Sequence, residues 1–182
     1  MNGGSIMYRV KLVVPSKEYE NQVMEYKAEM LKNNDSFDGC AGLEDVDKYD
    51  DWLNFEGRLS KKYGDAYVPS EVYLAVRLSD NMLIGIIDYR HPLSEFLLKY
   101  GGNIGYSVRP LVRRNGYAKE ILKLILCRCK ELDEERVLLT CDKGNIASSK
   151  VIIDNGGILE NEVEDTVGIS ESGIIQRYWI VL

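Results

Sequence analysis

The chain has 182 residues and a formal net charge of −6, with 45% hydrophobic and 29% charged residues. These values are ordinary for a soluble globular protein, and the length allows a proper core. The negative charge argues against general nucleic-acid binding, which needs a basic face, and no apolar run approaches the length of a membrane span. We therefore expect one domain over residues 1–182 that binds neither nucleic acid nor membrane.

The amino-terminal third predicts one strand and two helices. Residues 1–5 are small and polar, so we expect no signal peptide, and Met7 is an alternative start that would make residues 1–6 a leader. The β-branched residues of 8–14 predict a strand that ends at Pro15. Ser16 then suits the N-cap of a helix that runs to about Lys32. A second helix is expected over residues 46–59.

The middle of the chain predicts a hairpin and a short helical turn. After a loop at 61–70, residues 71–78 and 82–90 alternate as strands around a turn at 79–81. His91-Pro92 ends the second strand. Residues 94–100 predict a helical turn, which Gly101-Gly102 closes.

The rest of the chain predicts alternating strands and helices. A strand over 103–108 leads through a loop into a long amphipathic helix that begins at Asn115 or Gly116 and runs to about Leu132. The continuous apolar run at 136–141 indicates a strand buried on both faces. A helix from Asn145 to about Asn155 follows. The last strands are expected at 158–164 and 174–181, around an acidic hairpin loop.

The loop at 113–118 has the chemistry of an anion-binding site. It places Arg113, Arg114 and Gly116 at the start of a helix, where the first backbone N–H groups have no internal partner. Arginine suits phosphate oxygens, and glycine allows a phosphate to approach the backbone. A basic, glycine-containing turn before a surface helix is the alternative interpretation.

This stretch resembles the acyl-CoA pyrophosphate loop of the GNAT superfamily of N-acetyltransferases. The family pattern is Gln or Arg, two residues, Gly, one residue, then Gly or Ala, which here is Arg113-x-x-Gly116-x-Ala118. A second match is Asn145 followed by a helix that ends at Gly156-Gly157. The order of predicted elements also matches, and the stretches YRHPL, GGNIGYSVRP and IIQRYWI are similar to a bacterial group of predicted acetyltransferases.

The resemblance implies an α/β fold with a mixed central sheet of about six to seven strands flanked by helices. Acetyl-CoA would lie in a cleft between two splayed central strands, residues 103–108 and 136–141, and would need no metal. The backbone N–H of Val108 would hold the oxyanion while a primary amine attacks the thioester directly. The residues expected at the cosubstrate are Ser107, Val108, Arg113, Arg114, Asn115, Gly116, Tyr117, Ala118, Asn145 and Ser148.

The sequence departs from the family at the usual general acid. Many members carry a tyrosine seven residues after the Asn that corresponds to Asn145, but that position here is Ile152. The candidates that could replace it are Tyr106, His91 and Tyr178. His91 is equally explained as a turn residue before a proline, and Tyr106 as a core residue. These alternatives remain open at the level of sequence.

The acceptor is not named by the sequence. The acidic segment at 35–51 lies where the family places its variable acceptor-binding segment, which favours a cationic small-molecule or peptidic amine; a solvated helix face is the alternative. Four cysteines form no CxxC pair and have no histidine cluster, which predicts a reduced, cytoplasmic protein without zinc. A module that binds acyl-CoA without turnover is the alternative function, and a homodimer is an open alternative for the oligomeric state.

Overall fold

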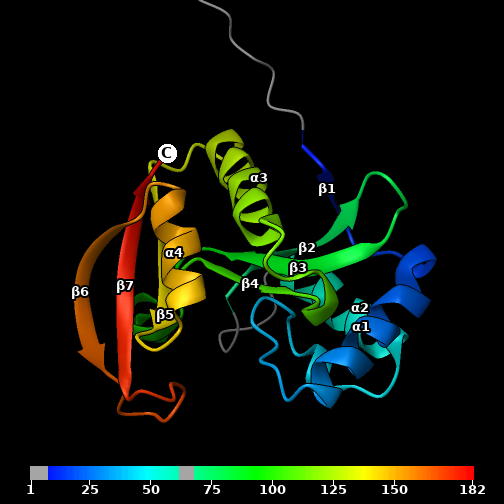
Figure 1. Cartoon of the computed structure of the whole chain (residues 1–182), viewed down its shortest axis with the longest axis horizontal. Helices are drawn as coiled ribbons and strands as arrows, with labels where there is room; N and C mark the ends of the chain where they lie inside the picture. Colours follow the sequence, from blue (N-terminus) through cyan, green and yellow to red (C-terminus); the bar gives the residue numbers. More distant parts are fainter. Residues whose placement is uncertain (1–7, 62–67) are drawn as a thin grey trace, which may run out of the picture.

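The computed structural model describes residues 8–61 and 68–182, and it contains two antiparallel sheets (Figure 1). The first sheet has the order β1-β2-β3-β4 and the second has the order β5-β7-β6. The strands are β1 (Val10–Val13), β2 (Ser70–Arg77), β3 (Leu83–Arg90), β4 (Ile104–Val108), β5 (Arg136–Asp142), β6 (Ile158–Glu164) and β7 (Ile174–Val181). The predicted α/β order of elements is confirmed. Most of the loop expected at 61–70 lies outside the described residues.

Two helices cover one face of the first sheet (Figure 1). They are α1 (Glu20–Lys32), which follows a single 3-10 turn at Lys17–Tyr19, and α2 (Tyr49–Leu59). Tyr26 and Trp52 are completely buried against the sheet. The predicted N-cap at Ser16 is wrong in one respect, because its side chain makes no capping hydrogen bond. Helix α2 begins three residues later than predicted, because the backbone of Val46 is extended.

The other face of the first sheet is covered by α3 (Tyr117–Glu131), and α4 (Ile146–Asp154) packs beside α3. The apolar face of α3 presents Ile121, Ile125 and Cys129, all without solvent exposure. Their cluster includes strand residues of both sheets, such as Ile87 of β3 and Leu139 of β5. On the α3 side, one core therefore runs from the first sheet to the second, whereas a separate core lies between the first sheet and the two helices α1 and α2.

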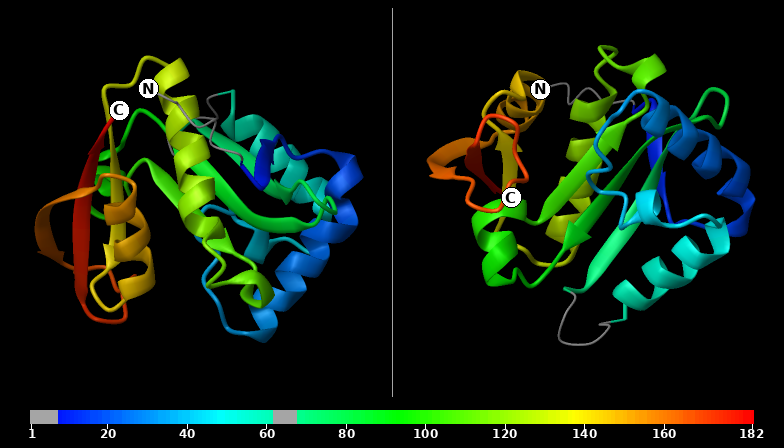
Figure 2. Two further views of the ribbon diagram at one scale, coloured as in Figure 1. Left: turned by 45° about the horizontal axis from the view of Figure 1, so that its top comes forward. Right: turned by 90° about the horizontal axis from the view of Figure 1, so that it is seen from below.

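The two sheets lie side by side (Figure 2), and hydrogen bonds of Asn103, just before β4, join them. Its backbone N–H donates to the Leu138 carbonyl at 2.7 Å, and its Oδ1 accepts the Leu138 N–H at 2.8 Å. On the other side, its carbonyl accepts from the Arg90 N–H, while its Nδ2 donates to the Arg90 carbonyl at 3.0 Å. One residue thus completes the hydrogen-bond ladders of β3 and β5, and beyond it β4 and β5 do not pair.

Gly102 makes this junction possible. Its φ is +67°, and a Cβ at this position would lie 2.6 Å from the Leu138 carbonyl oxygen. Only glycine accepts both this conformation and this close approach. The sequence predicted Gly101-Gly102 as the end of a helical turn, and the structure has a π-helical turn at Leu97–Gly101 immediately before it.

Candidate functional site

The free edge of β4 faces the second sheet. In an antiparallel pair, the backbone groups of every second residue point toward the partner strand. The Arg109 N–H donates to the Ile84 carbonyl at 2.7 Å, so the backbone groups of Ser107, two residues earlier, also point toward β3. The backbone groups of Tyr106 and Val108 consequently point away from β3, toward β5. This leaves an unpaired strand edge, which is the type of surface that accepts an extended ligand as an added strand.

A cavity of about 790 Å³ lies between the two sheets at this edge. We call it the transfer cavity. Its wall combines β4, the end of β5, the loop after α1 and the β6–β7 hairpin. Its main lining residues are Asp35, Ser36, Asp38, Ile104, Gly105, Tyr106, Thr140, Cys141, Asp142, Asn145, Ser148, Ser170 and Glu171.

Tyr106 is the candidate acid that lines the transfer cavity. Its hydroxyl lies 3.1 Å from the Ser148 hydroxyl, so the side chain bridges from β4 to α4. Burial raises the pKa of Tyr106 to about 12, and the Ser148 hydrogen bond opposes that shift. The phenol is therefore protonated at neutral pH and can donate a proton.

The other two candidate acids lie elsewhere. His91 stacks on the Tyr89 ring, and its Nδ1 lies 3.3 Å from a Glu134 carboxylate oxygen beyond the carboxyl end of α3. The hydroxyl of Tyr178 donates to Gln176 at 2.7 Å, and its ring belongs to the common core. Neither residue lines the transfer cavity. Ile152, at the position of the family's usual acid, is buried in the same core.

The side chains of Arg113 and Asn115 shape the loop before α3. Arg113 Nε donates to the Val108 carbonyl at 2.9 Å, and its Nη1 donates to Asp35 at 2.8 Å. The Asn115 amide donates to the carbonyls of Val112 and Arg113. These bonds hold the loop closed on itself and attach it to the segment that follows α1.

The helix N-terminus next to this loop is open to a ligand. Gly116 has φ +81°, and a Cβ there would meet only the Arg9 guanidinium, at 3.6 Å. Arg114 is exposed, with φ +63°. Tyr117 and Ala118 pack toward the core, so what the first turn offers to an anion is its backbone N–H groups. The site therefore fits a pyrophosphate held by backbone groups at the start of α3, with Arg114 exposed beside it.

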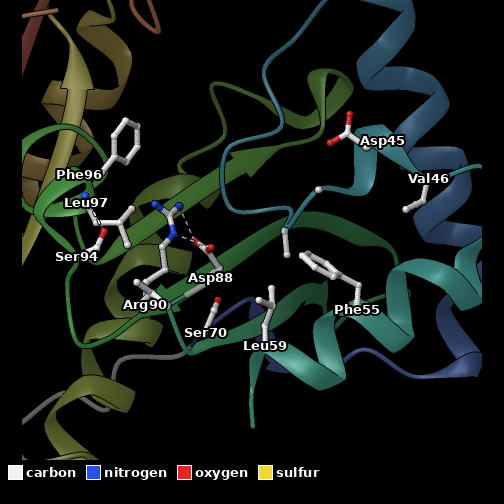
Figure 3. A pocket seen from close by; sticks show the side chains of 13 residues that line it. Asp45, Val46, Phe55, Leu59, Ser70, Asp88, Arg90, Ser94, Phe96 and Leu97 are labelled. Carbon is white, nitrogen blue, oxygen red and sulfur yellow. Dashed lines mark hydrogen bonds and ion pairs between the residues drawn. The ribbon is translucent and has the colours of Figure 1, made fainter. Parts of the chain in front are cut away.

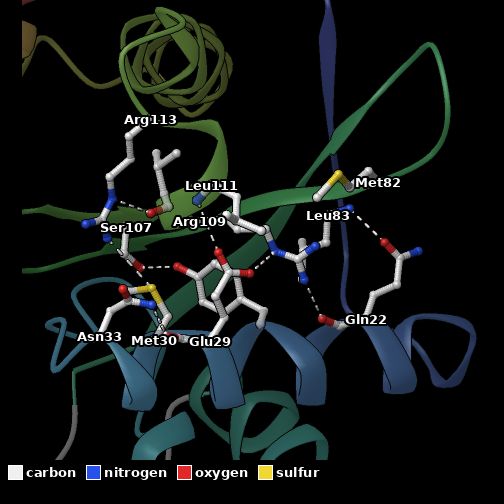
Figure 4. Close-up of polar contacts among 12 residues, drawn as sticks. Gln22, Glu29, Met30, Asn33, Met82, Leu83, Ser107, Arg109, Leu111 and Arg113 are labelled. Atoms are coloured by element: carbon white, nitrogen blue, oxygen red, sulfur yellow. Dashed lines mark hydrogen bonds and ion pairs between the residues drawn. The ribbon is translucent and has the colours of Figure 1, made fainter.

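A buried ion pair fastens this region to α1 (Figure 4). The Arg109 Nε lies 3.1 Å from a Glu29 carboxylate oxygen, and the two side chains are 7% and 18% exposed. The other Glu29 oxygen accepts the Leu111 N–H at 3.1 Å. Since α1 thereby holds the chain on both sides of Pro110, the path from β4 to α3 is fixed.

Two further residues expected at the cosubstrate have structural partners. The Ser107 hydroxyl points toward α1, where it accepts from Tyr26 at 2.8 Å and lies 3.2 Å from the Cys40 sulfur. Asn145 Oδ1 accepts the Ser148 N–H and caps α4. Asn145 and Ser148 do line the transfer cavity, so the cap also positions the partner of Tyr106.

Carboxylates dominate the charge of the transfer cavity. Asp35, Asp38, Asp142 and Glu171 line it, whereas Arg90 is the only cation among its described lining residues and is paired with Asp88. One oxygen of Asp35, Oδ2, is buried without a hydrogen-bond partner in the described structure. The other acidic residues of the segment 35–51 lie outside this cavity.

Sequence reasoning missed Asn103 and the two roles of Asp35. The sequence signal for Asn103 was its position directly after two glycines at a strand start, where a side-chain amide can replace a backbone donor. Asp35 was included only in a general acidic run. Its contact with Arg113 spans 78 positions of sequence, and local spacing carries no information about such a pair.

Within residues 8–61 and 68–182, none of the helices has the length and hydrophobicity of a membrane span. The same residues contain no group of three or more His, Cys, Asp or Glu side chains placed to hold a metal ion.

Comparison with known proteins identifies the family. A family model described as an acetyltransferase (GNAT) domain matches residues 44–158. A comparison with curated proteins finds no significant match. Solved structures share the fold at low sequence identity, and in three of them the identity to this chain is below one fifth.

The ribosomal-protein-S5-alanine acetyltransferase of Vibrio fischeri has a TM-score of 0.70 and 12% identity, covering 96% of this chain and 94% of that one. RimL, a ribosomal L7/L12 alpha-N-protein acetyltransferase in complex with coenzyme A, has a TM-score of 0.67 and 16% identity, covering 98% of this chain and 97% of that one. A spermidine N-acetyltransferase chimera from Vibrio cholerae and hSSAT has a TM-score of 0.67 and 10% identity, covering 95% of each chain. The chain belongs to the GNAT family of acetyl-CoA-dependent N-acetyltransferases.

Proposed function

We propose that this protein transfers the acetyl group of acetyl-CoA to an amine that binds in the transfer cavity. The supporting observation is that the free edge of β4 leads directly from this cavity to the open N-terminus of α3. Pantetheine extended along that edge would bring its thioester beside Tyr106 while its pyrophosphate lies at Gly116. The coenzyme A complex of RimL supports the same class of cosubstrate.

The residues of this chain have separate tasks in that reaction. The Val108 N–H, which points away from β3, is the donor for the thioester carbonyl oxygen. The neutral amine forms the new N–C bond at the carbonyl carbon as the C–S bond breaks. Coenzyme A leaves as a thiol after the sulfur gains a proton, which the Tyr106 phenol can donate, and the amine gives up the balancing proton to solvent or base.

The acidic lining favours a cationic acceptor. Asp38 and Glu171 lie on opposite sides of the transfer cavity, on the loop after α1 and on the β6–β7 hairpin. Carboxylates at a cleft raise the local concentration of ammonium groups, an effect that salt screens. Both a polyamine and a peptide amine would meet this requirement, and the fold neighbours include acetyltransferases named for each.

The test is thiol release from acetyl-CoA in the presence of spermidine, of a short peptide with a free N-terminus, and of a neutral amide control. We expect turnover with at least one amine and a Michaelis constant that rises with ionic strength. Asp38→Asn should raise that constant, whereas Asp51→Asn, on exposed α2 surface outside the cavity, should not. Tight acetyl-CoA binding without thiol release across the amines would instead support the non-catalytic binding module.

A further inference from the structure

A second cavity, of about 650 Å³, lies at the end of the sheet face that α1 and α2 cover (Figure 3). We call it the apolar pocket. Most of its walls are hydrophobic and come from the region of the 3-10 turn η2 (Leu43–Asp45), from α2 and from the turn after β3. The principal apolar lining residues are Val46, Phe55, Leu59, Val68, Phe96 and Leu97. Its volume lies in the range of small-molecule sites, roughly 300–1,000 Å³.

The few polar groups of the apolar pocket gather on one wall. Ser70 pairs directly with Arg90 across β2 and β3, and Val72 pairs with Asp88. Paired residues share a face of the sheet, so Ser70, Asp88 and Arg90 all project toward the α2 side. Figure 3 shows the three side chains next to one another, with Phe96 and Leu97 on one side and Phe55 and Leu59 on the other.

Ser70 is the polar side chain that the fold leaves unsatisfied. It is 6% exposed, and its hydroxyl has no hydrogen-bond partner within the described structure. A buried hydroxyl without a partner is unfavourable unless a ligand or water supplies one. Arg90 offers further donors next to it, because its Nε and Nη2 are held by Asp88 while Nη1 makes only a long contact of 3.3 Å with the Gly101 carbonyl.

Arg90 also connects the apolar pocket to the transfer cavity, because it lines both. Its Nη2 lies so close to Gly105 of β4 that a Cβ there would approach within 2.1 Å. Asp88 Oδ1 accepts the Gly105 N–H at 3.0 Å. The loop after α1 covers both spaces, with Asp38 over one and Gly42 over the other. Between these points the loop packs directly on β4, since a Cβ at Gly39 would lie 2.3 Å from the Gly105 carbonyl oxygen. A ligand that reaches both cavities would therefore pass over the Arg90 side chain, which lines both.

We infer that the apolar pocket binds the apolar end of the acceptor whose amine occupies the transfer cavity; this inference rests on the proposed function. The occupant is an aromatic or branched aliphatic group joined to the amine through a carbonyl-containing linker. The carbonyl oxygen accepts from the Ser70 hydroxyl and from the Arg90 Nη1, whose own contact with Gly101 is long. The apolar group fills the space between Val46 and Leu97. Amide-linked amines, including peptides with an apolar side chain, have this chemistry.

Direct binding tests the pocket without any turnover. The probe is 3-phenylpropanamide, and its binding to the full chain is measured by calorimetry. We expect saturable binding that Ser70→Ala weakens about fivefold, the loss of one hydrogen bond, and that Val46→Trp abolishes by filling the space. Ser94→Ala is the matched control, since Ser94 lines the pocket but its hydroxyl is already bonded to the Leu97 N–H.

The thermal unfolding of the variants provides the folding control. Ser70→Ala should not lower the melting temperature, because the hydroxyl it removes has no partner in the free protein. The absence of saturable binding to the parent overturns the inference, and so does binding that remains unchanged in both Ser70→Ala and Val46→Trp.

Turnover then tests the occupant. We compare 4-amino-N-benzylbutanamide with 4-amino-N-methylbutanamide, which carry the same amine and amide. We expect kcat/KM about tenfold or more higher for the benzyl compound, within the range that apolar pockets give, and loss of this advantage in Val46→Trp with little change for the methyl compound. An equal ratio in parent and variant overturns the inference while leaving the proposed function intact. No turnover with either amine, alongside pocket binding that behaves as expected, would instead contradict the proposed function.

Discussion

The loop before α3 and the transfer cavity use charged side chains in opposite ways. In the loop region, Arg109 is paired with Glu29, and Arg113 is bonded to Asp35 and to the Val108 carbonyl. What remains for a ligand is mainly backbone N–H. In the transfer cavity, Asp38 and Glu171 line open space. A motif arginine can thus serve to hold a backbone, while residues outside any motif line the cavity that we propose for the acceptor.

This difference matches what each region is proposed to bind. A pyrophosphate is the same in every reaction of the family, and a fixed array of backbone donors suits it. An acceptor differs between members, and side chains on loops change easily without altering the scaffold. Asp35 joins the two regions, because it lines the transfer cavity and also bonds Arg113.

The largest expected effect comes from adding a side chain to the loop. Gly116→Glu should abolish acetyl-CoA binding, because a carboxylate would occupy the space open to the pyrophosphate and repel it. Gly116→Ala is the matched control, since it imposes the same backbone strain at φ +81° without the charge. The measurement is calorimetric affinity in variants shown to be folded. Equal affinity of folded Gly116→Glu and parent protein would contradict this assignment of the loop.

Removal of the cavity phenol should have the next largest effect. Tyr106→Phe should lower turnover by ~10²–10⁴-fold at saturating acetyl-CoA, the range for a positioned acid, while acetyl-CoA affinity changes little. His91→Ala and Tyr178→Phe should stay within a few-fold, because neither residue lines the cavity. If all three variants keep nearly full turnover, water carries the proton and positioning alone accounts for catalysis.

The sequence predicted the order and approximate bounds of the strands and helices because β-branched runs, amphipathic spacing and glycines mark them locally. It also predicted the loop at 113–118, since the whole motif lies within six residues. It did not predict that β4 and β5 belong to separate sheets joined by Asn103, because that junction depends on side-chain bonds to Arg90 and Leu138.

The candidate site was predictable only where its parts are contiguous. The transfer cavity combines segments near positions 36, 105, 141 and 171, and no periodicity relates them. The side-chain direction of Ser107 could not be derived because strand register was unknown, and a shift of one residue would exchange it with Tyr106. The acidic run was recognised, but which of its carboxylates line a cavity depends on how the loop after α1 folds.

Breaking the attachment of the loop to α1 should affect stability more than chemistry. Glu29→Ala leaves the Arg109 guanidinium buried without its partner, which typically costs about 3–5 kcal/mol. The expected result is a large loss of unfolding free energy in denaturant titration. Glu25→Ala, on the exposed face of the same helix, should change it by less than about 0.5 kcal/mol. Similar losses in both variants would show that the ion pair adds nothing to the attachment.

The smallest expected effect is that of Asp142, one of the carboxylates that line the transfer cavity. It distinguishes carboxylates that hold the structure together from carboxylates that are available to a ligand. Although burial raises the pKa of Asp142, hydrogen bonds from Ser172 and the Gly144 N–H lower it overall, so the folded pKa lies below its ordinary value near 3.8. A depressed pKa means that the stabilisation is present at neutral pH and is lost as pH falls through the folded value. The melting temperature of Asp142→Asn should therefore lie below that of the parent at pH 7, but by no more than about 2–4 °C, because solvent screens an accessible carboxylate.

That difference should persist to about pH 4 and then shrink as the parent is acidified further, because the parent gains the proton that the variant already mimics. Asp38→Asn is the matched control. The Asp38 carboxylate accepts a bond from the nearby Ser36 hydroxyl and bridges no distant segments of the described structure, so its replacement should leave the melting temperature nearly unchanged. A gap for Asp142→Asn that widens in acid would mean that Asp142 is destabilised as a carboxylate. It would then belong with the carboxylates available to an acceptor rather than with those that hold the hairpin in place.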